Sequence, residues 1–480
     1  MISLSTTDNN LGKSFSQMGC QPEDAKSAYC DLLRIANAPL EELAKTNPNL
    51  LVFPKVLGDN KDDIDKLPLF TMAGSVESEA EVSKVKVTTG NLMGFVGTGE
   101  SQLEITSRFT PHEPGEPKED FFLHYMLEKV FALNLFDLKH LSGSGTFDFL
   151  IFLFPSYLQK ALSQGIYKTY QHFQKNDANL KGAVDVSHHI KESSPFRGRI
   201  SYKARERTCD NDMTELIRHT IEVIKTKPLG KTILFGNEET RRAVEAIVAA
   251  TPSYNSFDRE RIISKNARPV SHPYFTKYRP LQKICLAILR HEKLKYGNGS
   301  KQIYGILFDG AWLWEEYLAT ILTKCGFRHP RNKESSGAIY VWKGNPRYPD
   351  FYKGEQLKDF HYGQPIPDKN FILDAKYKRL ENSSIGRDDI HQLVTYMHIL
   401  PANRAGLIYP LENGNAIKQD VCQRIFGLGG KISTYGILIP VKEKYSDFTK
   451  SMNDIENKFS ARINSPESEI DMNEKAPDSK

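Results

Sequence analysis

The sequence predicts a multi-domain protein of the α/β class, with α+β organisation overall. Its 480 residues exceed what one ordinary hydrophobic core accommodates, so two or three domains are expected. Strand-like patterns dominate residues 80–109, helical periodicity follows, and helix and strand patterns alternate over 305–441. This order predicts a β-rich N-terminal unit (1–110), a mixed helical and β middle region (111–300) for contact with a partner, and a C-terminal mixed sheet flanked by helices (301–445).

The N-terminal unit is expected to begin with a frayed segment, because its first 20 residues are polar. A helix is predicted over 22–43 and a strand over 50–56. Apolar residues on both sides of 97–101 predict a hairpin. The Gly97-x-Gly99 pair belongs to this turn and opens no helix, so it is not interpreted as a phosphate loop.

The middle region combines helices with a basic extended segment. Helices are predicted over 121–136 and 147–162, with Pro155 bending or breaking the second, and again over 238–250 and 280–294. Asp210 or Asp212 is expected to cap a helix that runs to residue 227. The extended segment 181–207 carries Arg197, Arg199, Arg205 and Arg207. It is either a solvated strand edge that resists aggregation or a surface for a motor partner, a phosphate or DNA.

In the C-terminal unit the helix 309–325 is predicted to have an Asp309 cap, with Glu315 at the border of its apolar face and Glu316 on the opposite side. A second helix over 387–400 places Gln392 and Tyr396 one turn apart. Strands over 405–409 and 435–441 close the sheet. Residues 446–480 are rich in Ser, Asn, Asp, Glu and Lys and are expected to form a disordered tail.

Composition excludes several classes of protein. The net charge of +5 permits a nucleic-acid partner without requiring one. Six scattered cysteines without a C-x-x-C pair predict reduced thiols and neither zinc nor disulfides. The most hydrophobic run, 147–154, is far shorter than the roughly 20 residues that span a bilayer. No secretory segment is recognisable, so a cytoplasmic protein without a membrane partner is expected.

A nucleotide-hydrolysing motor is not visible in the sequence. Gly230-Lys231-Thr232 resembles the end of a P-loop, but Lys225 stands where the first glycine is required. If the function needs a motor, a partner has to supply it.

The strongest chemical signal is the apolar strand 371–377, which contains Asp374, Ala375 and Lys376, preceded by Pro349-Asp350. Residues two apart in a strand share a face, so Asp374 and Lys376 are expected to project together. Two carboxylates and a lysine suit a hard cation and phosphate chemistry. We expect Asp350, Asp374 and the carbonyl of Ala375 to bind one or two Mg²⁺ ions and Glu315 to contribute through water, with Lys376 positioning the attacking water.

The opposing interpretation is a surface salt bridge, which is the usual meaning of an isolated D-x-K triplet. Here the triplet is accompanied by an apolar strand, an upstream Pro-Asp, a glutamate helix and a Gln-x-x-x-Tyr helix. The combination is more specific than any of its parts.

These residues carry a resemblance to a known family. Pro349-Asp350 with Asp374-Ala375-Lys376 resembles the PD-(D/E)XK nuclease superfamily, and Gln392 with Tyr396 resembles the Q-x-x-x-Y helix of its RecB-like branch. The McrC family, also seen in LlaJI-type restriction systems, is similar over several segments: LWEEYL (313–318), YPDF (348–351), FILDAKYK (371–378), HQLVTYM (391–397), FVGTGESQLEITSRF (95–109), DFFLHYMLEKVF (120–131) and PFRGRISYKARERTCDN (195–211).

The resemblance implies a prokaryotic, Mg²⁺-dependent DNA endonuclease subunit that acts in restriction with a McrB-like AAA+ GTPase hexamer. In that family the hexamer binds GTP, recognises DNA and translocates, while the McrC-like subunit inserts its N-terminal region, stimulates hydrolysis and cuts. By this likeness Asp350, Asp374 and Lys376 are catalytic, supported by Glu315, Gln392 and Tyr396. The polar loop 351–370 is longer than a hairpin needs and either contacts DNA or is an insertion.

Two other functions stay open from the sequence. One is a RecB-like repair nuclease that works with a helicase. The other is a non-cleaving adaptor that activates a motor and keeps the nuclease fold as a scaffold.

Overall fold

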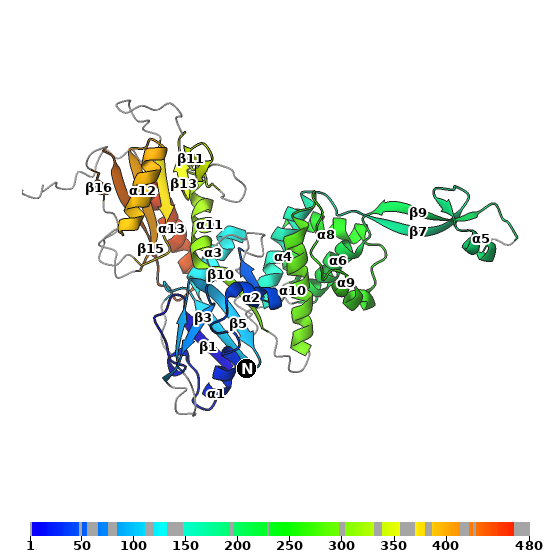
Figure 1. The fold of residues 1–480 in the computed structure, drawn as a ribbon, viewed down its shortest axis with the longest axis horizontal. Helices are drawn as coiled ribbons and strands as arrows, with labels where there is room; N and C mark the ends of the chain where they lie inside the picture. The colour runs from blue at the N-terminus through cyan, green and yellow to red at the C-terminus, as the bar shows by residue number, and fades with distance from the viewer. Residues whose placement is uncertain are drawn as a thin grey trace, which may run out of the picture.

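Figure 1 shows the chain as a β-rich N-terminal part, a helical part with a projecting arm, and a C-terminal sheet. This computed structural model describes residues 2–47, 50–54, 66–74, 84–110, 120–131, 147–192, 195–227, 230–296, 303–330, 338–355, 370–379, 386–412, 422–425 and 429–464. The multi-domain mixed architecture predicted from the sequence is confirmed.

The N-terminal sheet has five strands in the order β1-β6-β5-β10-β2. They are β1 (Ile2–Thr7), β2 (Leu50–Phe53), β5 (Leu92–Thr98), β6 (Ser101–Thr106) and β10 (Tyr304–Asp309). The predicted hairpin is β5–β6. Helices α1 (Ala25–Leu32) and α2 (Leu40–Thr46) and a two-stranded sheet of β3 (Phe70–Ala73) and β4 (Lys86–Thr89) complete the unit.

The expectation of a frayed first segment is wrong. β1 pairs in parallel with β6 over its whole length, and Leu4, Phe15 and Met18 are buried. The alternating Ser and Thr residues of β1 hide this strand from a composition argument, because only one face of an outer strand has to be apolar.

The boundary expected at residue 300 is also not the boundary of the sheet, because β10 pairs antiparallel with β5 and parallel with β2. Gly94 of β5, with φ +125°, makes this approach possible, since a Cβ there would lie 2.1 Å from the carbonyl oxygen of Ile306. The C-terminal unit therefore starts from a strand inside the N-terminal sheet.

The middle region is a helical bundle. Its helices are α4 (Phe147–Leu162), α6 (Asp212–Lys225), α7 (Gly230–Phe235), α8 (Glu238–Ala250), α9 (Arg259–Lys265) and α10 (Tyr278–Tyr296). Helix α3 (Phe121–Phe131) precedes them in the chain and packs against helices of the C-terminal unit. Helix α4 continues through Pro155 without breaking. The cap of α6 is Asn211, whose side chain accepts from the Met213 and Thr214 N–H groups, so neither Asp210 nor Asp212 takes the role predicted for it.

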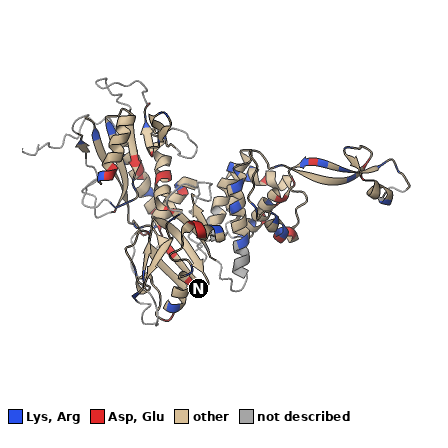
Figure 2. Ribbon diagram, in the orientation of Figure 1, with Lys and Arg blue, Asp and Glu red and all other residues tan. Residues whose placement is uncertain are grey.

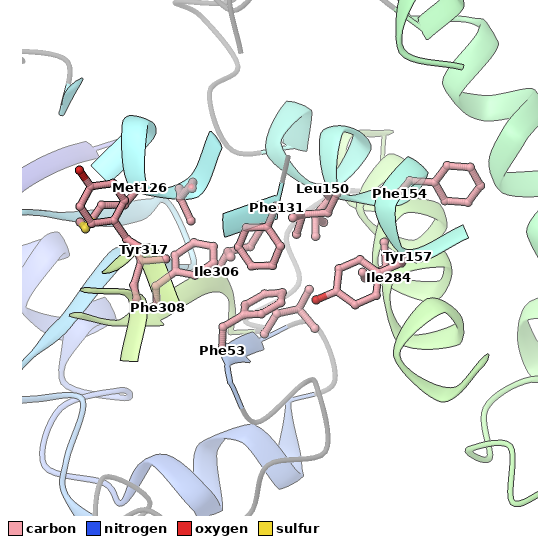
Figure 3. Packing of buried hydrophobic residues seen from close by; sticks show 14 of the residues in the cluster. Phe53, Met126, Phe131, Leu150, Phe154, Tyr157, Ile284, Ile306, Phe308 and Tyr317 are labelled. Carbon is pink, nitrogen blue, oxygen red and sulfur yellow. The ribbon is translucent and has the colours of Figure 1, made fainter. Parts of the chain in front are cut away.

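A continuous core joins this bundle to the N-terminal sheet, as Figure 3 shows. Phe53 of β2 stacks on Phe308 of β10, and Phe131 of α3 meets both rings. Tyr157 of α4 and Ile284 of α10 extend the cluster into the bundle.

An arm projects from the bundle (Figure 1). It consists of β7 (Thr169–Asp177), β8 (Ala183–Val184), α5 (Val186–Glu192) and β9 (Ile200–Thr208), with β9 paired antiparallel to β7 and β8. The extended structure predicted for 181–207 is thus present, interrupted by α5.

The C-terminal sheet has the order β13-β14-β15-β17-β16. Its strands are β13 (Phe351–Lys353), β14 (Phe371–Ala375), β15 (Arg404–Glu412), β16 (Cys422–Arg424) and β17 (Lys431–Ile439); a separate hairpin comprises β11 (Ile339–Trp342) and β12 (Asn345–Arg347). The three central strands are parallel and the outer ones antiparallel. Helix α12 (Arg387–Ile399) covers one face, because Leu393 and Met397 pack with Ile372 and Leu407. Helices α11 (Gly310–Leu322) and α13 (Tyr445–Asn464) share a core with Leu373 and Ile408 on the other.

Helix α13 overturns the predicted tail over its described part. Phe448, Met452, Phe459 and Ile463 are buried on its inner face, at helical spacing within an otherwise polar sequence. Residues 465–480 lie outside the described part of the chain. None of the described helices is long and apolar enough to cross a bilayer.

Candidate active site

Asp374 of β14 and Lys376, which directly follows the strand, place an acid and a base at the end of the sheet. Asp374 is 1% exposed, and the Lys376 Nζ atom lies 2.6 Å from its Oδ2 atom. The Lys376 amide donates to the Ile408 carbonyl oxygen at 2.8 Å, which fixes the backbone just after the strand ends. The shared face predicted for Asp374 and Lys376 is therefore present.

Asp350 reaches the same place from the neighbouring strand. It directly precedes β13, which pairs antiparallel with β14 in the register Phe351 to Leu373. Its Oδ2 atom accepts from the Ala375 N–H at 2.7 Å. Two carboxylates separated by 24 positions in the chain are thus brought together by one strand pairing.

Burial and like charge shape the electrostatics. Burial raises the pKa of Asp350 well above its ordinary value, and the charges of Asp374 and Glu315 raise it further. Burial also raises the pKa of Asp374, although Lys376 opposes the shift. For Lys376 burial lowers the pKa, but the carboxylates of Asp374, Asp350 and Asp389 outweigh it, so the pKa is raised and the lysine stays protonated.

Helix α12 supplies the supports predicted from the sequence and one that was missed. The Lys376 Nζ atom donates to Gln392 Oε1 at 3.0 Å, and Gln392 Nε2 donates to the Tyr396 hydroxyl at 3.3 Å. Asp389 was not predicted. Its Oδ1 atom lies 3.7 Å from Lys376 Nζ, and its other oxygen accepts from Lys378. Its place one helical turn before Gln392 is the signal that could have identified it.

Helix α11 carries Glu315 and Glu316 beside the site. Glu315 is near enough for its charge to act on Asp350, in agreement with the predicted orientation. Glu316 does not lie on an opposite, unrelated side. The His329 Nδ1 atom lies 3.9 Å from Glu315 Oε1 and its Nε2 atom 3.7 Å from Glu316 Oε1, so both carboxylates lie on the flank of the helix next to this ring. His329, also missed in the sequence, has its Nδ1 atom 2.8 Å from the Asp350 carbonyl oxygen.

The side chains at the site supply some, but not all, of the ligands that a hard cation requires. Neither oxygen of buried Asp374 has a hydrogen-bond partner of good geometry in the described part of the chain, although its Oδ2 atom forms an ion pair with Lys376 and its carboxyl group adjoins that of Asp350. Asp350 and Asp374 are oxygen ligands of the kind that Mg²⁺ prefers. Within the described ranges no three His, Cys, Asp or Glu side chains form a ready metal-binding group. The contributions predicted for the Ala375 carbonyl and, through water, for Glu315 stay predictions.

The arginines proposed for partner contact lie elsewhere. Arg205 and Arg207 are on β9, and Arg197 and Arg199 directly precede it, so all four belong to the arm, away from the carboxylates (Figures 1 and 2). The Arg205 guanidinium covers the Tyr170 ring at 4.7 Å. Of the loop 351–370, residues 356–369 lie outside the described residues.

A family model described as McrBC 5-methylcytosine restriction system component matches residues 87–410 of this chain. The match includes the strand with Asp374 and Lys376 and covers more than half of the sequence. The chain belongs to the McrBC family. The family resemblance predicted from the sequence motifs is thereby confirmed.

Two solved structures from the archaeon Thermococcus gammatolerans are similar to this McrBC-family chain. One is a refined half-complex from a tetradecameric assembly of McrB AAA+ hexamers with bound McrC, with 16% identity, 94% of this chain and 100% of that chain covered, and a TM-score of 0.45. The other is a cryo-EM structure of the McrBC complex, with 16% identity, coverage of 69% and 90%, and a TM-score of 0.33. No curated protein matches.

Proposed function

We propose that this McrBC-family chain is the endonuclease subunit of a restriction system and hydrolyses DNA phosphodiesters with Mg²⁺ at the site of Asp350, Asp374 and Lys376. The observation that carries the proposal is the ion pair at 2.6 Å between buried Asp374 and partly exposed Lys376, with Asp350 fixed beside it by the Ala375 amide. A purely structural ion pair would not require a second carboxyl group beside it whose pKa is raised by desolvation and by the neighbouring acids.

Each residue has a distinct task in this chemistry. Asp350 and Asp374 would hold the metal, which supplies Lewis acidity toward the phosphate oxygens when bound. Lys376, protonated and partly exposed, donates to the attacking water or to the charge that develops on the phosphate. Gln392 accepts from Lys376 and so orients it, and Tyr396 orients Gln392.

The proposal assigns the motor to another polypeptide, a McrB-like AAA+ GTPase, because the T. gammatolerans structures contain McrC bound to McrB AAA+ hexamers and the chain lacks a P-loop. The arm is the candidate contact. Residues 169–208 hold eight basic and four acidic residues. Exposed apolar side chains gather toward its tip: Leu180, Val184, Val186, Ile190 and Phe196. Such an element suits insertion between subunits of a ring. The protein as a whole is expected to act in the prokaryotic cytoplasm, where DNA is accessible.

The test is copurification with the AAA+ protein encoded beside this chain, followed by cleavage of methylated and unmethylated plasmid with GTP and Mg²⁺. Asp374→Asn and Lys376→Ala should each reduce cleavage at least about 100-fold, because each removes a group at the reacting phosphate. Assembly and stimulated GTP hydrolysis should persist. Lys442→Ala, which changes an exposed lysine in the same unit, is the control.

Retained cleavage by either variant would remove the site assignment. A complex that hydrolyses GTP but never cuts either plasmid would instead identify the chain as an adaptor.

A further inference from the structure

The β11–β12 hairpin presents aromatic side chains to solvent. Tyr340 is 46% exposed, Val341 39% and Trp342 64%. The register between the strands shifts between Tyr340 and Trp342, as at a β-bulge. A contiguous exposed patch of large apolar side chains is typical of a binding surface.

The base of the hairpin is fixed to the candidate active site. Ile339 is 1% exposed and belongs to the same buried cluster as Tyr352 of β13 and Leu393 and Tyr396 of α12. Tyr396 is the residue that orients Gln392. The exposed rings are therefore carried on a rigid base.

The charge of the hairpin is of one sign. Residues 338–348 include Lys343 and Arg347, both exposed, and no Asp or Glu. Lys343 is next to Trp342 at the turn, where Gly344 adopts φ +85°. The Arg347 Nη1 atom donates to the Pro346 carbonyl oxygen at 3.0 Å, which keeps the guanidinium beside the hairpin. Cations beside exposed aromatic rings are the usual combination at a nucleic-acid surface.

The position in the chain connects this surface to the carboxylates. Arg347 ends β12, and Tyr348, Pro349 and Asp350 follow directly. Arg347 therefore lies three residues before Asp350 in the chain.

We propose that the β11–β12 hairpin contacts the DNA next to the cleaved phosphodiester, with Trp342 and Tyr340 stacking on nucleotides and Lys343 and Arg347 contacting phosphates. This inference rests on the proposed function. A protein surface is the less suitable occupant, because a patch with cations and no carboxylate favours a phosphate backbone.

The experiment measures DNA binding without cleavage. The full chain with Asp374→Asn, in complex with its AAA+ partner, is titrated against a fluorescein-labelled DNA duplex, and anisotropy reports affinity. Trp342→Ala should weaken binding about tenfold, and Trp342→Phe should restore most of it because the ring is kept. Arg347→Ala should reduce the salt dependence of binding by about one phosphate contact. Phe257→Ala is the matched control, since Phe257 is 93% exposed and lies in the helical bundle.

Equal affinity of the Trp342→Ala and parent complexes would overturn the inference. Loss of the complex with the AAA+ protein on size-exclusion chromatography, with DNA affinity kept, would also overturn it and identify a protein contact. The proposed function fails separately: a parent complex that never cuts DNA with GTP and Mg²⁺ contradicts it even where Trp342-dependent binding is found.

Discussion

At the scale of single residues, the acids at the site outnumber the two lysines that contact them, Lys376 and Lys378. Lys376 contacts Asp374 at 2.6 Å and Asp389 at 3.7 Å, while Asp350 accepts from a backbone amide instead of a cation. Unbalanced buried charge is costly to folding and favours a bound cation. The free energy of unfolding should therefore be lower for the metal-free protein than for the protein with a bound cation.

Replacing Asp350 tests this cost. Burial and the charges of Asp374 and Glu315 raise the pKa of Asp350, so the folded protein retains a proton that an unfolded chain loses near pH 3.9. The stability from the neutral acid is complete below that pH and is lost as pH rises through the folded pKa. Asp350→Asn should therefore raise the Tm of the metal-free protein at neutral pH, by roughly 2 °C or more, with a gain that disappears toward about pH 4. Differential scanning fluorimetry across pH measures it. A lower Tm at neutral pH would contradict it.

Asp389 is expected to act as a positioning residue. Its charge helps to raise the pKa of Lys376 and also raises that of Asp374. Asp389→Asn should lower both pKa values, so both limbs of the pH profile of cleavage move to lower pH, with a loss of rate of about tenfold. Asp388→Asn, an exposed neighbour on the same helix, should leave the profile in place. An unmoved profile for Asp389→Asn would leave this residue a purely structural role.

The sequence predicted the central residues because a strand alternates its faces, which determines that Asp374 and Lys376 share one. Helical spacing likewise placed Gln392 beside Tyr396. His329 was missed because its neighbours come from tertiary packing: the His329 ring stacks on Phe351 with centroids 4.9 Å apart. Asp389 was missed although its helical spacing from Gln392 could have identified it. Glu316 was misplaced because its position around the helix does not show which other parts of the chain pack against it.

At the scale of elements, helix α13 closes the core over α3 and α11. Glu456 accepts from the Tyr125 hydroxyl at 2.7 Å and from the Tyr317 hydroxyl at 2.9 Å, and pairs with Lys129 at 2.9 Å. The sequence concealed this helix because composition averages over polar and apolar faces. Only the spacing of its buried residues distinguishes it from a solvated tail.

Phe448 should account for much of the stability that α13 provides. It is 2% exposed and meets the rings of Phe121 and Tyr125 edge-on. Phe448→Ala should lower the free energy of unfolding by about 3–5 kcal/mol, because the cavity lies in a dense aromatic cluster. Lys450→Ala, exposed on the same helix, should change it by no more than about 0.5 kcal/mol. Urea denaturation followed by circular dichroism separates the two. Equal effects would mean that α13 is not packed in solution.

At the scale of the whole molecule, the N-terminal sheet and the candidate active site are built into each other. Strand β10 lies inside that sheet and continues directly into α11, which carries Glu315. This connection could not be predicted from the sequence, because a strand that joins a sheet more than 200 residues after its neighbours β2 and β5 leaves no local pattern. The order of elements along the chain was predictable, but not which sheet each strand joins.

Tyr377, the residue after Lys376, makes the second connection. Its hydroxyl lies 2.9 Å from Ser107 Oγ and 3.2 Å from Met93 Sδ, and the Arg108 guanidinium covers its ring at 4.9 Å. These partners belong to β5 and to the segment after β6. A shift of the N-terminal sheet would therefore move Tyr377, the residue next to Lys376.

A double-mutant cycle tests whether this contact couples the two parts. Tyr377→Phe and Ser107→Ala each remove one hydroxyl of a buried pair, so each should lower the number of DNA cuts per GTP hydrolysed by the complex, by about three- to tenfold, while the GTPase rate itself stays unchanged. Because both variants break the same hydrogen bond, the double variant should be no worse than the more damaging single one. Additive losses would mean that the two residues act independently. A parallel fall in GTP hydrolysis would place the defect in partner contact instead of in the link between the N-terminal sheet and Lys376.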